Sequence, residues 1–173
     1  LVELIMQIRL SIKNDIQHIM EIIHYAQRYL ASLNIDQWQD GYPDEAQITN
    51  DINNKESYVV IDGSTTIGTF MFSIAGEPTY KVIDGNWLTD NQTNYGVIHR
   101  IAVSEKNTNK GIAKYIISDC EKQLTSQGIH SMRIDTHPDN KGMQHILKSL
   151  SYTYCGIITL ERGGIRLAFE KIL

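Results

Sequence analysis

The sequence has few residues that could cross-link the chain or restrict its backbone, with two cysteines and three prolines among 173 residues. Cys120 and Cys155 lie far apart and outside any CxxC pattern, so we expect reduced, buried thiols in a cytoplasmic protein. A basic excess is also missing, because the formal net charge is −4. This balance argues against nucleic acid or an anionic membrane as a partner, and any anion site must be local.

Long apolar runs are absent too. No uncharged stretch reaches the roughly 18 apolar residues of a membrane span. The first five residues, "LVELI", lack the basic flank and long apolar run of a signal peptide, and they are either native or an addition. The length predicts a single domain over residues 1–173, large enough to bury a core without disulfides.

Several cofactor motifs are missing as well. Neither GxxxxGK[ST] nor GxGxxG occurs, which argues against a nucleotide P-loop and a dinucleotide fold. "IDTHPDN" places His137 near Asp135 and Asp139, but no CxxC or HExxH accompanies it. We therefore interpret this segment as a strand end and turn, and we predict no metal site.

Periodicity predicts alternating strands and helices along the chain. Strands are expected at 6–12, 57–61, 66–74, 95–103, 131–136, 153–160 and 165–172. Helices are expected at 14–33, from about 44, at 111–127 and after "HPDN". This order predicts an α/β (α+β) protein with a mixed sheet flanked by helices and a right-handed crossover from 95 to 136.

Local signals refine three of these elements. Asn14 is the expected cap of the first helix, whose buried stripe should end at Leu33. Asp62-Gly63 predicts a tight hairpin turn. The long polar segment 75–94 is expected to be either a functional lid or disordered.

The segment "EKNTNKGIAKYIISDC" (105–120) joins a predicted strand to a predicted helix. At a helix N-terminus the first N–H groups lack internal partners and bear partial positive charge, so a phosphate fits there. Gly111 would let such a ligand approach the backbone, with Lys106, Lys110 and Lys114 near it. These lysines are either ligand contacts or an ordinary solvated face.

"TNKGIA" (108–113), with "IHRIAVSEKN" before it and "DTHPDNKGMQHILKSLSYTYCGI" after it, resembles the GNAT superfamily of N-acetyltransferases. The family pattern is [Gln/Arg]-x-x-Gly-x-[Gly/Ala], and Thr108 departs from it. The resemblance extends over nearly the whole chain and is greatest to small bacterial stand-alone members with a "DQWQ-GYP" loop. It implies a GNAT fold, a twisted, mostly antiparallel sheet of about seven strands, splayed between strands four and five.

The resemblance also implies a cosubstrate, acetyl-CoA. Main-chain groups of strand four would pair with pantetheine, and the loop amides would hold the pyrophosphate. Asn140 would contact the pantetheine or adenosine arm or only cap its helix. The predicted contacts are Ile101, Ala102, Val103, Thr108, Asn109, Lys110, Gly111, Ile112, Ala113, Lys114 and Asn140.

Acetyl transfer to an amine needs a proton acceptor, and His99 is the first candidate because it lies on the strand expected to deliver the thioester. Its alternative is an inert, packed histidine. His137 is the second candidate. Arg100 should face away from His99 by the two-residue period of a strand. Leu147 stands where the family's usual acid, a tyrosine, is found, so the acid is left unassigned.

The acceptor pocket is expected between variable loops, where aromatic rings and a carboxylate suit a cationic amine. Its predicted members are Trp38, Tyr42, Glu77, Tyr80 and Trp87, although Trp38 and Tyr42 could instead only cover the core. The sequence thus predicts an acetyl-CoA-dependent N-acetyltransferase for a small or peptide amine. The alternative is a non-catalytic acetyl-CoA-binding or regulatory module. A homodimer is the default expectation.

Overall fold

The computed structural model describes residues 6–173 and divides them into two compact units. The first unit contains the chain up to Phe72 together with Arg100–Ile116, and the second contains Ser73–His99 and Ile117–Leu173. The "LVELI" segment lies outside the described residues. Strand β5 (Gly96–Val103) and helix α3 (Ile112–Ser126) each contribute residues to both units.

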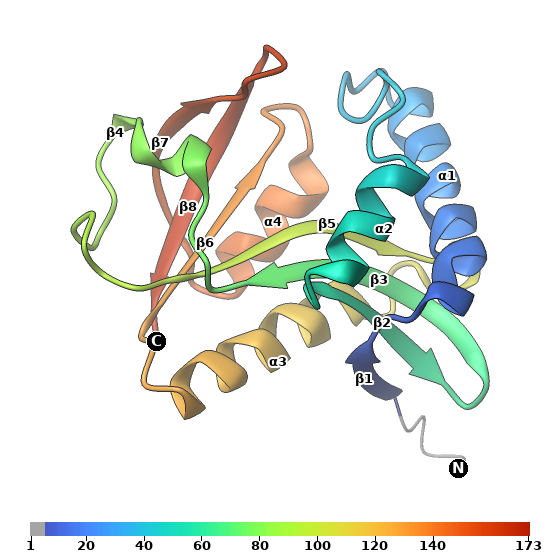
Figure 1. Cartoon of the computed structure of the whole chain (residues 1–173). Coiled ribbons are helices and arrows are strands. Elements are labelled where there is room, and N and C mark those ends of the chain that lie inside the picture. Colours follow the sequence, from blue (N-terminus) through green and yellow to red (C-terminus); the bar gives the residue numbers. More distant parts are fainter. Residues whose placement is uncertain (1–5) are drawn as a thin grey trace. The chain divides into compact units, whose positions relative to one another are not determined.

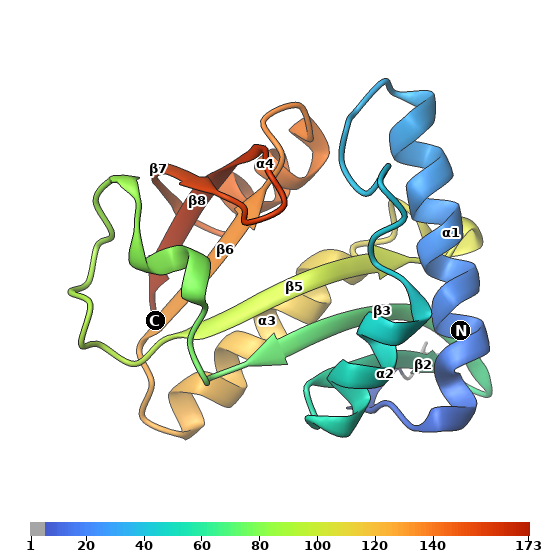
Figure 2. The same ribbon diagram turned by 45° about the horizontal axis from the view of Figure 1, so that its top comes forward.

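The first unit contains strands β1 (Met6–Leu10), β2 (Ser57–Asp62) and β3 (Thr65–Ser73), ordered β1-β2-β3-β5. Asp62 pairs with Thr65 across the predicted turn, and Gly63 there has φ +60°. Helices α1 (Ile16–Ser32) and α2 (Glu45–Asn53) lie side by side in Figures 1 and 2. Their apolar faces share a core with β2, formed by Ile19, Ile23, Ile48 and Val59.

The second unit contains strands β6 (Ser131–Thr136), β7 (Thr153–Thr159) and β8 (Ile165–Ile172) with helix α4 (Lys141–Ser149). Its strand order is β5-β6-β8-β7-β4. With the first unit's order this makes one eight-stranded sheet, in which the β5–β6 pairing is parallel. Its core includes Tyr80, Val97, Ile158 and Ala168.

The segment 75–94, expected to be either a functional lid or disordered, contains short elements that the sequence analysis did not predict. It holds a 3-10 turn (Pro78–Lys81) and a two-residue strand, β4 (Asp84–Gly85), which pairs antiparallel with β7 (Figure 1). This strand makes the sheet one strand larger than the expected seven. Periodicity cannot detect a strand this short.

The first helix also begins and ends differently from the prediction. Asn14 does not cap it, because a 3-10 turn (Lys13–Asp15) precedes α1 and the Asp15 carboxylate accepts from the Ile12 N–H at 2.8 Å. The Asp15 carboxylate also binds Arg9 at 2.7 Å. Leu33, the expected end of the buried stripe, is 51% exposed. Ile22, which the stripe did not include, is buried on α1. The remaining predicted strands and helices are confirmed to within a few residues.

Two other predictions concern the whole chain. Both cysteines are unpaired and buried, as expected. None of the helices in residues 6–173 is long and apolar enough to cross a membrane.

β4 depends on Gly85 and Gly156, which pair with each other and let the backbones of β4 and β7 approach closely. A Cβ on Gly156, whose φ is +146°, would lie 2.2 Å from the Asp84 carbonyl oxygen. We therefore expect Gly156→Ala to lower the free energy of unfolding by about 2–3 kcal/mol. Gly163→Ala is the control, because Gly163 has φ +87° and no atom within 4 Å; it should cost about 1 kcal/mol.

Urea unfolding measures this difference, and hydrogen exchange locates it. The Asn86 N–H donates to the Cys155 carbonyl at 2.9 Å, so its exchange should accelerate in Gly156→Ala only. Equal losses of stability in both variants would show that the close approach is unimportant.

Candidate active site

The loop before α3 turns its backbone into a left-handed conformation twice, at Asn109 (φ +60°) and Gly111 (φ +78°). Within residues 6–173, no atom apart from those of Gly111 and its two chain neighbours lies within 4 Å of the place where a Cβ of Gly111 would be. The Gly111 carbonyl accepts the Tyr115 N–H at 2.9 Å, so α3 begins directly after this glycine. The sequence anticipated this turn from its glycine.

The main-chain donors of this loop point to anion binding. In residues 6–173, the N–H groups of Asn109, Lys110 and Gly111 make no hydrogen bond, and those of the first turn of α3 have no acceptor in a preceding turn. Thr108 instead bonds back to the Glu105 carbonyl through its hydroxyl at 3.1 Å. Consecutive N–H donors at a helix N-terminus bind phosphate oxygens.

The remaining predicted contacts of the loop follow from its helix. Ile112 is 3% exposed and belongs to the core, so it could contact a ligand only through its backbone. Ala113 and Lys114 are half-buried, whereas Lys106 and Lys110 are exposed. The exposed side chains of Lys106 and Lys110 are therefore open to solvent.

Strand β5 contains a break in its regular backbone at Arg100, which has φ +56°. Its parallel pairing with β6 covers Gly96↔Met132 and Val97↔Arg133 only, although the strands have 8 and 6 residues. Within residues 6–173 no further position of β5 pairs with β6, which agrees with the splay expected between the strands at 95–103 and 131–136. The left-handed backbone at Arg100 interrupts the two-residue alternation of side chains, on which the expected direction of Arg100 depended.

Arg100 is held by two partners in the first unit, the buried Asp51 and the half-buried Tyr42. Its guanidinium donates to the Asp51 carboxylate at 2.7 and 3.0 Å, and to the Tyr42 hydroxyl at 2.6 Å. Gln47 donates to the other Asp51 oxygen at 2.9 Å. Side-chain exposures of 9% for Arg100 and 4% for Asp51 place this ion pair away from water. The sequence analysis did not identify this Arg100–Asp51–Tyr42 clamp.

The strand continues to the predicted pantetheine contacts. Ala102 is 4% exposed, while Ile101 and Val103 are half-buried. Just past them the Ser104 N–H donates to the Ile67 carbonyl at 2.9 Å, which ties the end of β5 to β3.

His99 lies in a polar cluster of the second unit. Its Nε2 is 2.8 Å from the Glu77 Oε2, and its Nδ1 is 3.7 Å from the Asp135 Oδ2. The Tyr80 hydroxyl donates to the same Asp135 oxygen at 2.7 Å. Sequence reasoning named His99, Glu77 and Tyr80 separately. It missed Asp135 as their partner because that residue was considered only for metal binding.

The Glu77 carboxylate is fully occupied. Thr79 donates to Oε1 through its N–H at 3.1 Å and its hydroxyl at 2.8 Å, which leaves Oε2 for His99. Burial alone would raise the pKa of Glu77, but the hydrogen bond and charge of His99, with the two Thr79 donors, lower this pKa to about 2. Glu77 is therefore a carboxylate at neutral pH and a weak base.

Tyr80 and Trp87 pack against one another within the second unit, with ring centroids 5.1 Å apart. Tyr80 is 1% exposed, and burial with the nearby Asp135 raises the pKa of its hydroxyl well above 10. Trp87 donates from Nε1 to the Tyr80 carbonyl at 3.0 Å, and its ring covers the Arg133 guanidinium at 4.3 Å. Tyr80 can act on an acceptor only through Asp135 and His99.

Of the other predicted residues, one belongs to the first unit and the rest to the second. Trp38 belongs to the loop after α1 in the first unit, with φ +62°. The His137 Nδ1 accepts the Asp139 N–H at 3.1 Å, as expected for a turn. The Asn140 side chain accepts from the Met143 N–H at 3.1 Å, which confirms its role as a helix cap. Leu147 is completely buried. Residues 6–173 contain no group of His, Cys, Asp and Glu suited to a metal.

The low pKa of Glu77 predicts an acid-sensitive contribution to stability. The folded-state pKa lies near 2 and the ordinary value is 4.5, so this contribution is complete above pH 4.5 and is lost as pH falls towards 2. Because Glu77 and His99 are only 20% and 19% exposed, we expect roughly 1–2 kcal/mol, less than a fully buried pair would give.

Chemical denaturation of wild type and Glu77→Gln at pH 5 and pH 3 measures this effect. The wild type should lose more stability than the variant between these pH values. Glu45→Gln, at an exposed carboxylate of α2, should behave like wild type. Equal losses in wild type and Glu77→Gln would contradict the pairing.

Comparison with known proteins identifies the family of this chain. A family model described as Acetyltransferase (GNAT) family matches residues 21–152. A GNAT-family acetyltransferase from Streptococcus agalactiae is 37% identical, with a TM-score of 0.87 over 97% of this chain and 95% of that chain.

Two more distant structures share the fold. A GNAT-family acetyltransferase from Listeria monocytogenes has 18% identity and a TM-score of 0.76, covering 97% of this chain and 95% of its own. The acetyltransferase yncA from Salmonella typhimurium, solved with its cofactor acetyl-CoA, has 16% identity and a TM-score of 0.64, covering 97% and 94%. No curated protein sequence matches. Because the family model matches more than half of its length, the chain belongs to the GNAT family of acetyltransferases and is an acyltransferase.

Proposed function

We propose that the protein transfers an acetyl group from acetyl-CoA to a primary amine of a small molecule or peptide, by direct attack in a ternary complex. The observation that supports this most is the loop at the start of α3, where Asn109 and Gly111 expose consecutive N–H donors. Acetyl-CoA supplies an activated acyl group and a diphosphate that such donors can bind.

The residues of this chain fit that cosubstrate at two places. The Gly111 turn has open space for phosphate oxygens, with Lys110 beside it. The β5 residues Ile101–Val103 lie beyond the two positions at which β5 pairs with β6, so their main-chain groups suit an extended amide-bearing arm. Asn140, the cap of α4, remains a second proposed contact.

The acceptor amine must lose a proton before it attacks. An alkyl ammonium has a pKa near 10.4, so its neutral form costs roughly 4–5 kcal/mol at pH 7. His99 is the proposed base. Glu77 holds the Nε2 side of the ring, which leaves Nδ1 to accept a proton, and the carboxylates of Glu77 and Asp135 stabilise the positive charge that the ring then acquires. His137 is the second candidate.

The reaction also needs a donor to the developing oxyanion and a proton for the leaving thiolate. We assign the first role to the backbone and the second to solvent. The left-handed Arg100 reorients the peptide between Arg100 and Ile101, and a main-chain N–H here is the proposed donor to the developing oxyanion. Leu147 cannot donate a proton to the leaving thiolate. A free thiol has a pKa near 8.5, so proton transfer from water is a small demand.

Leu147 is also the observation that favours a second function, a non-catalytic acetyl-CoA-binding module. Thiol release from acetyl-CoA over a panel of amines separates the two. Binding of acetyl-CoA without turnover on every amine would favour the module. A cytoplasmic location is proposed as well, since both cysteines are unpaired thiols.

Gly111→Val should raise the acetyl-CoA dissociation constant at least tenfold, because a β-branched residue is disfavoured at φ +78° and fills the space beside the donors. Gly128→Val is a matched control, since Gly128 follows the other end of α3 with φ +74° and no atom within 4 Å. Calorimetric titration with acetyl-CoA measures both variants. Unchanged affinity in a folded Gly111→Val protein would refute the loop assignment.

His99→Ala should lower kcat/KM at least tenfold at pH 7 and less at pH 9.5, where more of the amine is already neutral. His145→Ala, at an exposed histidine of α4, is the control and should leave the profile unchanged. The measurement is the rate of thiol release against pH at saturating acetyl-CoA. A loss of equal size at all pH values would remove His99 as the base.

A further inference from the structure

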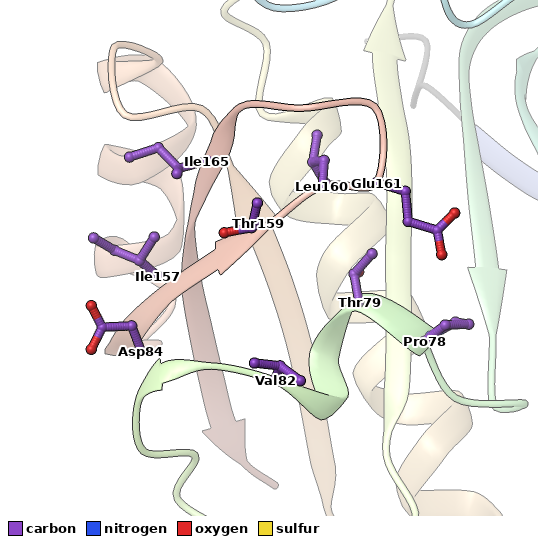
Figure 3. A pocket seen from close by; sticks show the side chains of 9 residues that line it. All are labelled: Pro78, Thr79, Val82, Asp84, Ile157, Thr159, Leu160, Glu161 and Ile165. Carbon is purple, nitrogen blue, oxygen red and sulfur yellow. The ribbon is translucent and has the colours of Figure 1, made fainter.

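The second unit contains an open hollow of about 660 Å3 that no sequence prediction included. Figure 3 shows that it lies between the 3-10 turn and β4 on one side and the β7–β8 hairpin on the other. The residues that line it are Pro78, Thr79, Val82, Asp84, Ile157, Thr159, Leu160, Glu161 and Ile165. Its size is in the range of ordinary small-molecule sites.

The lining combines apolar walls with negative charge. Val82 and Ile165 are 80% and 44% exposed, so the hollow leaves large apolar side chains in water. Asp84 and Glu161 are its charged members, and no lining residue is basic. Within residues 6–173 neither carboxylate forms an ion pair or a side-chain hydrogen bond. Unpaired carboxylates beside an apolar wall complement a ligand with both cationic and apolar parts.

The two carboxylates are separated along the hollow. In Figure 3, Asp84 lies at one end beside Ile157, while Glu161 lies at the other end towards Pro78 and Thr79. Apolar side chains such as Val82 lie between them. This arrangement fits an elongated ligand better than a compact one.

The Glu161 end is linked to the His99 cluster. Thr79, which lines the hollow, donates its hydroxyl to Glu77 Oε1 at 2.8 Å, and Glu77 Oε2 is 2.8 Å from His99 Nε2. Two hydrogen bonds therefore join the wall of the hollow to the proposed base. All of these residues belong to the second unit.

We propose that this hollow binds the acceptor, and that the acceptor is a small molecule with a second cationic group separated from its reacting amine by an apolar chain. Asp84 binds the distal cation, and Glu161 attracts the amine that reaches His99. The choice of acceptor rests on the proposed function, but the preference for a doubly charged ligand can be measured without turnover.

The expected preference for a doubly charged ligand depends on how exposed Asp84 and Glu161 are. Both carboxylates are exposed, so each contributes about what surface ion pairs do, 0.2–1 kcal/mol or roughly a 1.4- to 5-fold change in affinity. Because n-hexylamine already has one cationic group, the second group of 1,6-diaminohexane should make it bind roughly 1.4- to 5-fold more tightly. The advantage should shrink at high salt because solvent screens exposed charges.

The experiment is calorimetric or NMR titration of the whole chain with these two amines. Asp84→Asn/Glu161→Gln should abolish the preference for the diamine and weaken n-hexylamine binding only by the roughly 1.4- to 5-fold of one ion pair. Asp84 contributes to β4 only through backbone pairing with β7, so Asp84→Asn preserves the strand. Glu21→Gln, at an exposed carboxylate of α1, removes a charge elsewhere and should keep the preference.

Thiol release with the same amines separates this inference from the proposed function. If the diamine binds preferentially and neither amine is acetylated, the hollow is supported and the transferase function is not. If the amines bind equally, or if the double variant keeps the preference, the proposal is wrong, whatever the turnover. It is equally wrong if only peptide amines bind, or if a dimer buries Val82 and Ile165.

Discussion

The left-handed backbone of Arg100, held by a buried ion pair, is the constraint on which the rest of the site depends. A positive φ at a residue other than glycine costs on the order of 1 kcal/mol. Arg100 remains there because its guanidinium is bound by Asp51 and Tyr42 with little exposure to water. Loss of one partner from such a pair costs about 3–5 kcal/mol, which exceeds the strain. The clamp therefore maintains the turn in β5 and, through it, the main-chain groups that are proposed to bind acetyl-CoA.

A second buried pair orders the segment before β5. Glu170 is completely buried and accepts from Ser131 at 2.6 Å, from the Leu88 N–H at 2.6 Å and from Arg133 at 3.3 Å. Arg133 lies between the rings of Trp87 and Tyr95, about 4 Å from each. The segment 86–95 is thus attached to the sheet by side chains despite its polar composition. This attachment also positions β4, which contains Asp84, and it positions Tyr95. The Tyr95 hydroxyl accepts the Glu77 N–H at 3.2 Å.

The sequence predicted the features that depend on local pattern and missed those that depend on distant contacts. The hairpin at Asp62-Gly63, the turn at Gly111 and the Asn140 cap are local, and all three are confirmed. The His99–Glu77 pair joins residues 22 apart, and the clamp on Arg100 joins residues 49 and 58 apart. Composition gives no sign of such pairing. Asn14 failed for another reason, since Asp15 next to it accepts the same kind of bond and also has Arg9 as a partner.

Acetyl-CoA and the acceptor place different demands on the sequence. The proposed cosubstrate contacts of Asn109–Gly111 and Ile101–Val103 are largely main-chain groups, so many side chains can stand there, including Thr108 in place of the usual residue. A protein with 18% identity shares the fold with a TM-score of 0.76. The acceptor, in contrast, would meet side chains of Asp84, Glu161 and the apolar wall, where each substitution alters recognition. On this proposal, acceptor specificity can change without disturbing the backbone proposed to bind the acyl donor.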